Sequence, residues 1–241
     1  MSTRTILAVT GSDREKFLQG LVTNDVAKAR GGIAYAALLT PQGKYLADFF
    51  MIGQEDRILI DVDTSLAPML LQRLSMYKLR SNVQLEATDM PVARGTGDAP
   101  EGALIDPRDP AMGWRLYGSE GDDGTDWDAL RVEHLIPETG RELGPDSYIL
   151  EMGFERLNGV DFKKGCYVGQ EVTARMKHKT ELKKGLARVT LDAPVDAGTD
   201  LTSNDRPAGT VHTVSGNKAL AYLRFDRAEN LTAGTTPAKV D

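Results

Sequence analysis

Apolar residues in the first third of the chain follow the period of β-strands. They alternate with polar residues or run continuously through IAYAALLT, YLADFFMI, RILIDVD and NVQLEAT, which predicts four strands. The first two stretches are separated by residues 41–44, where Pro41 and Gly43 favour a tight turn. The sequence therefore predicts a β-hairpin that continues into a sheet.

Two stretches in the same region have the spacing of helices instead. Residues 12–15 match a capping box and precede KFLQGL, which predicts a short helix. A second helix is predicted to begin at Thr64 or Ser65. Its apolar residues form one stripe, which is typical of a core-facing helix: Leu66, Met69, Leu70, Leu74 and Tyr77.

A similar order of elements begins near Gly102. The strand ALID, a turn at DPRDP, the strand MGWRLYG and a helix from about Asp126 to Leu135 follow one another. Strands followed by a helix, occurring twice, predict an α+β fold with two related halves rather than a doubly wound parallel sheet. The acidic run GSEGDDGTD is expected to be a mobile, solvent-facing loop.

The pattern changes after Lys184. GLARVTL, TDLTS, PAGTVHTV and KALAYLRF are short alternating stretches separated by Gly, Pro, Asn and Asp. This is the pattern of a small antiparallel barrel or sandwich. We expect a domain in two subdomains over residues 1–180 and a small β-barrel over residues 181–241.

Composition narrows the class of protein. The chain has 241 residues, of which 41% are hydrophobic, enough to fill globular cores. The longest apolar runs are strand-sized, so we expect no membrane span. The first residues resemble neither a signal peptide nor a transit peptide, which predicts a cytoplasmic protein. One cysteine and three widely spaced histidines predict neither a disulfide nor a dedicated metal site.

Charge is unevenly spread along the chain. The net charge is −6, but residues 163–184 contain seven Lys or Arg, Lys179 among them, and only two Glu. A basic segment in an acidic protein favours an anionic ligand or partner over direct nucleic-acid binding. A solvated basic face is the alternative. RNA binding is a weaker alternative, because Tyr167 is the segment's one aromatic residue.

The same segment holds the single cysteine. Cys166 lies in KKGCYVGQE, next to Lys163 and Lys164, with a glycine on each side that permits close approach or positive φ. The lysines and a helix start at Gln170 would favour the thiolate. Cys166 is thus a candidate nucleophile, redox thiol or metal ligand, with a buried structural cysteine as the alternative. A cysteine hydrolase using His178 as base is disfavoured, because that histidine lies 12 residues further on.

KGCYVGQE resembles the signature of the YgfZ family, folate-binding proteins related to the aminomethyltransferase of the glycine cleavage system. Further segments match that family in order: FLQGLVTNDV, LLTPQGKYLADF, RLSMYKLRSNV, DPR with GWR, and NGVDFKKGCYVGQEVTAR. The resemblance implies a folate-binding domain of two interlocked ferredoxin-like halves followed by a small antiparallel β-barrel. It also implies support of iron–sulfur cluster assembly or repair, with an indirect effect on tRNA modification through iron–sulfur enzymes.

The resemblance also implies site residues. Lys164 and Cys166 would be the functional pair, with their frame formed by Gly165, Gly169, Gln170 and Glu171. Cys166 would act as a redox thiol or as a ligand of a transient iron–sulfur cluster shared with a partner.

Tetrahydrofolate is the implied cofactor, and its two ends call for different residues. A buried acid should meet the pterin ring and basic residues should meet the glutamate tail. Glu133 and Asp48 lie near the positions of a pterin-binding glutamate and a catalytic aspartate in the related aminomethyltransferases. Arg175 is the candidate for the tail, with a structural ion pair as the alternative.

Two departures from the family concern neighbouring regions. Residues 148–151 read Tyr-Ile-Leu-Glu where most relatives have Leu-Pro-x-Glu. The barrel is also shorter than in the aminomethyltransferases, so contacts from their barrel are not assumed.

We therefore expect an accessory or maturation factor rather than a classical enzyme. Its expected partners are folate and iron–sulfur carrier or client proteins. The alternative is a folate-dependent aminomethyl or C1-transfer enzyme, in which Asp48 and Glu133 would be active-site acids.

Overall fold

The computed structural model describes residues 4–178 and 181–241. The chain forms two compact units, each discontinuous in sequence. The first contains Met1–Thr125 and Glu155–Ala174, and the second contains Asp126–Phe154 and Arg175–Asp241. The contiguous division at residues 180 and 181 stays a prediction.

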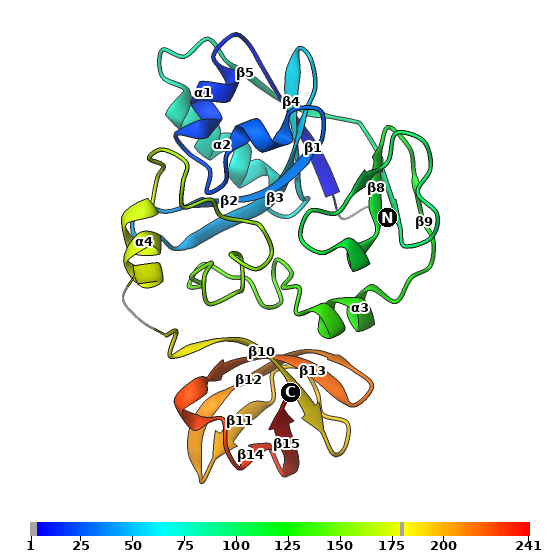
Figure 1. The fold of residues 1–241 in the computed structure, drawn as a ribbon, viewed down its shortest axis with the longest axis vertical. Coiled ribbons are helices and arrows are strands. Elements are labelled where there is room, and N and C mark those ends of the chain that lie inside the picture. The colour runs from blue at the N-terminus through cyan, green and yellow to red at the C-terminus, as the bar shows by residue number, and fades with distance from the viewer. Residues whose placement is uncertain (1–3, 179–180) are drawn as a thin grey trace. The chain divides into compact units, whose positions relative to one another are not determined.

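A five-stranded antiparallel sheet is the base of the first unit (Figure 1). Its strand order is β2-β3-β4-β1-β5. The strands are β1 (Arg4–Thr10), β2 (Ile33–Leu39), β3 (Tyr45–Gly53), β4 (Arg57–Asp63) and β5 (Gln84–Thr88). The predicted hairpin and the two strands after it are confirmed.

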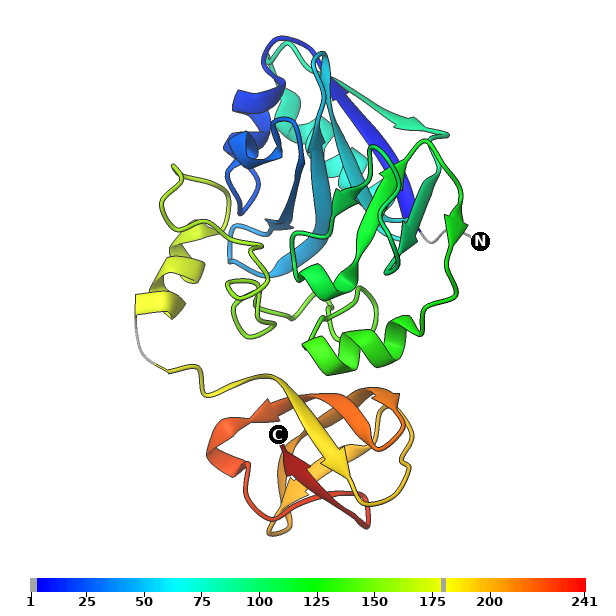
Figure 2. The ribbon, with the colours of Figure 1, turned by 45° about the vertical axis from the view of Figure 1, so that its right-hand side comes forward.

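Two helices cover one face of this sheet: α1 (Arg14–Gln19) and α2 (Ala67–Lys78) (Figures 1 and 2). A short 3-10 helix, η1 (Val26–Ala29), follows α1. The predicted apolar stripe of α2 faces the core, since Leu70 and Leu74 are fully buried. Every second strand residue, such as Phe49 and Met51, packs against these helices. The other face of the sheet carries the polar side chains described below.

The predicted capping box at residues 12–15 is wrong. The N-cap of α1 is Asp13, and its side chain makes no capping bond. Instead the Asn82 backbone N–H donates to Asp13 Oδ2 (2.8 Å) and the Asn82 side chain donates to Ser12 Oγ (3.0 Å). A tertiary contact has replaced the local one.

A smaller four-stranded sheet completes the first unit, with strand order β7-β8-β6-β9. Its strands are β6 (Val92–Gly95), β7 (Leu104–Ile105), β8 (Trp114–Tyr117) and β9 (Gly121–Asp122), and η2 (Pro110–Met112) precedes β8. Much of the acidic run 118–126 is exposed, as predicted, but it contains β9. Its Asp123 carboxylate also accepts hydrogen bonds from the Thr96 N–H and the Thr125 hydroxyl (both 2.6 Å).

The second unit contains a closed six-stranded barrel in the order β10-β13-β12-β11-β14-β15. Its strands are β10 (Lys184–Leu191), β11 (Asp200–Ser203), β12 (Arg206–Ser215), β13 (Lys218–Arg224), β14 (Leu231–Ala233) and β15 (Thr236–Val240), and η3 (Phe225–Arg227) follows β13. Burial alternates strictly along β10, as expected where one side of a strand lines a core. Four strands match the predicted stretches, and the α+β fold class with a C-terminal antiparallel barrel is confirmed.

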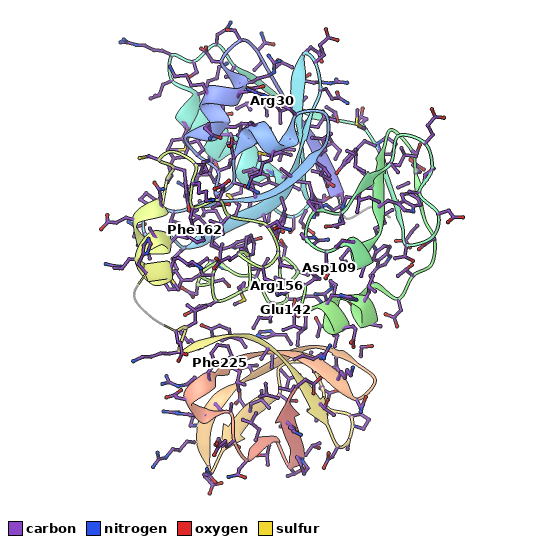
Figure 3. All side chains as sticks on the ribbon, viewed as in Figure 1. Arg30, Asp109, Glu142, Arg156, Phe162 and Phe225 are labelled. Carbon is purple, nitrogen blue, oxygen red and sulfur yellow. The ribbon has the colours of Figure 1, made fainter. Side chains whose placement is uncertain are left out.

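Helix α3 (Trp127–His134) belongs to the same unit as the barrel and is capped by the Asp126 side chain, which accepts from the Ala129 N–H. Arg131 on this helix is buried and donates to Glu142 (3.0 Å) and to the Thr213 hydroxyl of β12 (2.9 Å). Glu142 is labelled in Figure 3. Turns occupy residues 135–169, up to α4 (Gln170–His178). None of the helices in the described residues is long and apolar enough to cross a membrane.

Candidate functional site

Cys166 lies on an exposed loop immediately before α4. Its thiol is free and exposed, while the residues two before it and one after it, Lys164 and Tyr167, are buried. The buried-cysteine alternative is therefore wrong. The loop presents its thiol to solvent and is held from beneath by its neighbours.

Lys164 supplies most of that support. Its ammonium group donates to three backbone carbonyls, those of Gln19 (2.8 Å), Val22 (2.5 Å) and Asn24 (3.0 Å). An ammonium has three N–H donors, so these bonds use all of them. Burial lowers the pKa of Lys164 to about 8, although the carboxylates of Asp25 and Asp161 act in the opposite direction.

Tyr167 forms the other support of the loop. The Lys164 ammonium lies 5.1 Å from the centre of its ring, within cation–π range. Burial raises the pKa of Tyr167 to about 12. Lys164 thus binds the protein interior, and these three hydrogen bonds go to carbonyls rather than to Cys166. Its predicted role as a chemical partner of the thiol stays a prediction.

Thr23 and Asn24 connect this loop to the large sheet. The Thr23 hydroxyl donates to the Gly159 carbonyl (2.7 Å) and accepts from the Ala37 N–H of β2 (2.8 Å). The Asn24 amide donates to the carbonyls of Tyr35 on β2 (2.8 Å) and Asn158 (2.7 Å). These two residues lie within the segment FLQGLVTNDV, which matches the family. Their hydrogen bonds are a structural reason for that match, and the sequence alone shows no other.

In the motif KKGCYVGQE, position 169 is the one at which the backbone conformation requires a glycine. It has φ +83°, and a Cβ there would lie 2.5 Å from the Thr40 carbonyl oxygen. Gly43, in the β2–β3 turn, has φ +75°, and its Cβ would lie 2.7 Å from Cβ of Val172 on α4. The hairpin turn and the start of α4 therefore meet backbone to backbone, which positions the cysteine loop on the sheet.

The other predicted frame residues have fewer constraints. Gly165 is exposed, and a Cβ there would meet no described atom within 4 Å. Gln170 begins α4 and is half-buried, whereas Glu171 and Arg175 on the same helix are exposed. Binding roles for these four residues stay predictions. Lys179 lies outside the described residues.

Asp48 lies on β3, on the sheet face opposite α1 and α2. It is buried, and its two carboxylate oxygens accept hydrogen bonds from the hydroxyls of Tyr35 (2.8 Å) and Tyr45 (2.6 Å). Burial, together with the charge of Asp48, raises the pKa of Tyr35 well above its usual value. A charged residue in a hairpin strand usually faces solvent, but Asp48 does not.

Cations from the smaller sheet and its loops lie close to the same face. Arg108 forms a bidentate pair with Asp106 (3.0 and 2.8 Å), and its guanidinium lies 4.9 Å from the Phe50 ring and 5.5 Å from the Tyr35 ring. Burial by itself raises the pKa of the Asp106 carboxyl. The charge and hydrogen bonds of Arg108 outweigh burial, so the pKa of this carboxyl is lowered. We call the whole group the polar layer: Arg4, Tyr35, Tyr45, Asp48, Asp61, Asp106, Arg108, Arg115 and Tyr117.

Glu133 is not the buried acid that a pterin ring was expected to meet. Its side chain is 51% exposed and pairs with Lys218 (2.8 Å) and Arg188 (3.0 Å) of the barrel. The hydrogen bond from Lys218 and the charge of Arg188 lower the pKa of Glu133. It belongs to the second compact unit and Asp48 to the first. Folate contact at Glu133 stays a prediction.

Sequence reasoning named Asp48 but missed most of its surroundings. From the sequence, Tyr35 and Tyr45 were predicted only to lie in strands. In the structure, Ala37 pairs with Asp48 and Tyr35 pairs with Phe50 across β2 and β3. The DPR and GWR segments supply Asp106, Arg108 and Arg115. The sequence showed only that these segments match the family, and it assigned them no place in the site. Across the described residues, no group of three or more His, Cys, Asp and Glu is arranged to hold a metal ion.

Comparison with solved structures shows the fold. The aminomethyltransferase T of the glycine cleavage system from Bartonella henselae matches with a TM-score of 0.78 over 98% of this chain and 82% of that one. The sequence identity is 15%, so the likeness concerns architecture alone. Residues 183–241 match the family model described as the CAF17 C-terminal β-barrel domain.

Comparison with curated proteins shows the family. The mitochondrial iron–sulfur cluster assembly factor IBA57 of Mus musculus is 32% identical over 92% of this chain and 76% of its own length. The Homo sapiens protein of the same name is 33% identical over 91% of this chain and 75% of its own length. This chain belongs to the IBA57 family. The family is related to the YgfZ proteins, so the resemblance carried by KGCYVGQE is confirmed at the level of iron–sulfur cluster assembly factors.

The prediction of a cytoplasmic protein is wrong by the same comparison. The relatives in mouse, human and Mycosarcoma maydis are all named as mitochondrial, which points to the mitochondrion. The prediction rested on the first residues of the sequence, which resemble neither a signal peptide nor a transit peptide.

Proposed function

We propose that this chain supports the assembly or repair of iron–sulfur clusters through Cys166. The observation that carries the proposal is the exposed thiol on a loop whose buried Lys164 is bound by three carbonyls. Membership of a family of assembly factors supplies the context. A thiol held on a fixed loop at the surface is suited to reach a partner.

The chain's own residues limit the chemistry. A protein-held cluster usually needs four thiolates, and this chain has one cysteine. In the first version Cys166 supplies one ligand to a cluster whose other ligands belong to a carrier or client protein. In the second, the Cys166 thiolate attacks a partner's disulfide, forming a mixed disulfide and releasing the partner's second sulfur as a thiolate. Any effect on tRNA modification is then indirect, through iron–sulfur enzymes.

Tetrahydrofolate is the proposed cofactor, and the residues of the polar layer support this proposal. Asp48 is a buried carboxylate that two tyrosine hydroxyls hold in place, which suits an acceptor for ring N–H groups. Arg108 and Arg115 put positive charge on the same side of the sheet. Glu133 fits less well, because two barrel cations already pair with it.

Absorption spectra test the ligand version. An apo-carrier protein is loaded with iron and sulfide in the presence of wild type or of Cys166→Ala, and the visible bands of the cluster are compared. We expect wild type to change the bands and Cys166→Ala to leave the spectrum of the carrier alone. Lys163→Met, which alters an exposed neighbour, should behave as wild type. Identical bands with wild type and Cys166→Ala would sink the ligand version.

A folate-dependent C1-transfer enzyme is the second candidate, and the burial of Asp48 favours it. Buried acids with fixed partners are typical of active sites. This candidate leaves the exposed thiol of Cys166 without a role. Turnover of a methylamine donor with tetrahydrofolate, present in wild type and lost in Asp48→Asn, would favour it over the assembly factor.

A further inference from the structure

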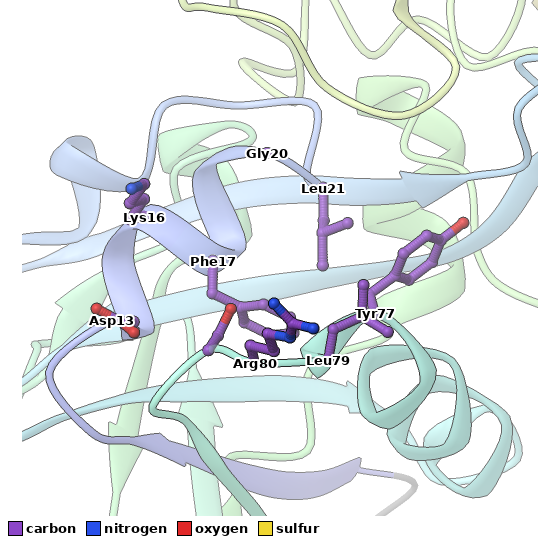
Figure 4. Close-up of a pocket in the computed structure, with 9 residues that line it drawn as sticks. Asp13, Lys16, Phe17, Gly20, Leu21, Tyr77, Leu79 and Arg80 are labelled. Atoms are coloured by element: carbon purple, nitrogen blue, oxygen red, sulfur yellow. The ribbon is translucent and has the colours of Figure 1, made fainter.

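A wide groove lies between α1 and the C-terminal end of α2, on the helical side of the sheet. Its volume is about 820 Å³. Phe17 and Leu21 point into it from the α1 side, and Tyr77 and Leu79 border it from the α2 side (Figure 4). Neither the cysteine loop nor the polar layer contributes a lining residue.

Leu79 is unusual in both its backbone and its exposure. It has φ 43° and ψ −109°, and the turn that contains it is closed by a hydrogen bond from the Ser81 N–H to the Lys78 carbonyl (2.8 Å). This conformation favours glycine, and a leucine adopts it at a cost. The side chain is nevertheless 88% exposed, so burial does not offset the strain. Met76, three residues earlier, is 63% exposed.

The groove also carries two cations, Lys16 and Arg80. Within the described residues, the side chains of Lys16 and Arg80 make no hydrogen bond or ion pair. The carboxylate of Asp13, which also lines the groove, accepts from the Asn82 N–H. The negative end of the α2 dipole attracts cations near residue 80. It does not account for Lys16, which lies on α1.

We propose that this groove is a docking surface for an acidic amphipathic segment of a partner protein. Apolar side chains of the segment would cover Leu79, Tyr77 and the edge of Phe17, and carboxylates beside them would pair with Lys16 and Arg80. Charge complementarity carries the choice of occupant, since within the part of the chain that the structure describes these two cations have no acidic partner. The proposal goes beyond the cluster chemistry and does not depend on Cys166.

The probe is a pair of fluorescent 16-residue helical peptides with the same leucine face, one with glutamates beside it and one with lysines. Binding is measured by fluorescence anisotropy at low and high salt. We expect the acidic peptide to bind, more weakly at high salt, and the basic peptide not to bind. Leu79→Gly should weaken binding about tenfold. It should also keep or raise stability, because glycine fits φ 43°. That combination separates a docking role from a structural one.

The charge variants have a matched control. Arg80→Glu should weaken binding of the acidic peptide, while Arg206→Glu, an exposed barrel residue with the same change of charge, should not. Cys166→Ala should bind as wild type, so a failure of the cluster proposal would not affect this one.

Four results would overturn the proposal: equal binding of both peptides, unchanged binding by Leu79→Gly, binding of anionic lipid vesicles in place of the acidic peptide, or self-association lost in Leu79→Gly. The last would assign the groove to a second copy of the chain.

Discussion

At the scale of single residues, Lys164 has a clear physical role. A buried charge is costly unless it is paired or hydrogen-bonded, and here three carbonyls accept from it. The carbonyl of Gln19 is 145 residues away in sequence. Lys164 therefore fastens the cysteine loop to the start of the chain, which no local pattern could have indicated.

Lys164→Met tests that role. The substitution keeps the length of the side chain but leaves three carbonyls without their donor, so we expect the free energy of unfolding to fall by about 3 kcal/mol. Lys163→Met is the matched control, because that side chain is exposed, and its effect should stay within about 0.5 kcal/mol. Urea denaturation measures both. Equal losses in the two variants would contradict the assignment.

The lowered pKa of Lys164 predicts a dependence of stability on pH. Burial lowers the pKa from 10.5 to about 8, so below pH 8 the fold carries a charge that its surroundings disfavour. Between those values the unfolded chain binds more protons than the native one, and stability rises with pH. The free energy by which wild type exceeds Lys164→Met should thus increase from pH 7 to pH 10. If this free-energy difference decreased between pH 7 and pH 10, the three carbonyls would stabilise the charged ammonium of Lys164 more than burial destabilises it.

Asp48 provides the residue-scale test of folate binding. Its carboxylate is the only buried acid among the predicted site residues that the structure describes. Asp48→Asn should weaken tetrahydrofolate binding about tenfold in calorimetry. Glu133→Gln, at an exposed ion pair, should weaken it less. A thermal melt of Asp48→Asn shows whether the tyrosine contacts survive, and equal effects of the two substitutions would refute the preference for Asp48.

At the scale of elements, the two glycines of KGCYVG differ in how strictly the surrounding structure requires glycine. Gly169 has positive φ and meets the Thr40 carbonyl in the β2–β3 turn, whereas Gly165 has open space around it. Sequence reasoning treated them alike, since both flank the cysteine. Only the packing of the hairpin turn against α4 separates them.

That difference predicts opposite outcomes for the same substitution. Gly169→Ala should lower the free energy of unfolding by about 3 kcal/mol, because the new Cβ is strained and collides with backbone. Gly165→Ala should stay within about 0.5 kcal/mol of wild type. Chemical denaturation measures both. If Gly165→Ala folds normally but fails in cluster assembly, a partner approaches the loop closely there.

Several elements follow from periodicity, but others were missed, among them the seven-residue strand β1. The hairpin around residues 41–44 and the stripe on α2 follow from periodicity, and both are confirmed. Strands β9 and β14 are two and three residues long, too short for a periodic signal. The contacts of Asn82 with Ser12 and Asp13 join segments 70 and 69 residues apart in sequence, at the end of the paired strands β1 and β5, which is why the local capping box was the wrong prediction.

At the scale of the whole molecule, one hydrogen-bonded path connects the two candidate sites of the first unit. Lys164 donates to the Asn24 carbonyl, the Asn24 amide donates to the Tyr35 carbonyl, and the Tyr35 hydroxyl donates to Asp48. The thiol loop and the polar layer therefore share supports. Family resemblance named both ends of this path, Lys164 and Asp48, but its middle is formed by tertiary contacts that the sequence does not display.

The central claim is that Cys166 serves iron–sulfur cluster maturation, and aconitase activity tests it most directly. Cells lacking this protein are complemented with wild type, Cys166→Ala or Lys163→Met, and the [4Fe–4S] enzyme is assayed at equal levels of each variant. We predict that wild type and Lys163→Met restore activity and Cys166→Ala does not. Equal rescue by Cys166→Ala would reduce the thiol to a surface residue, and no defect in the deleted cells would contradict the assembly role itself.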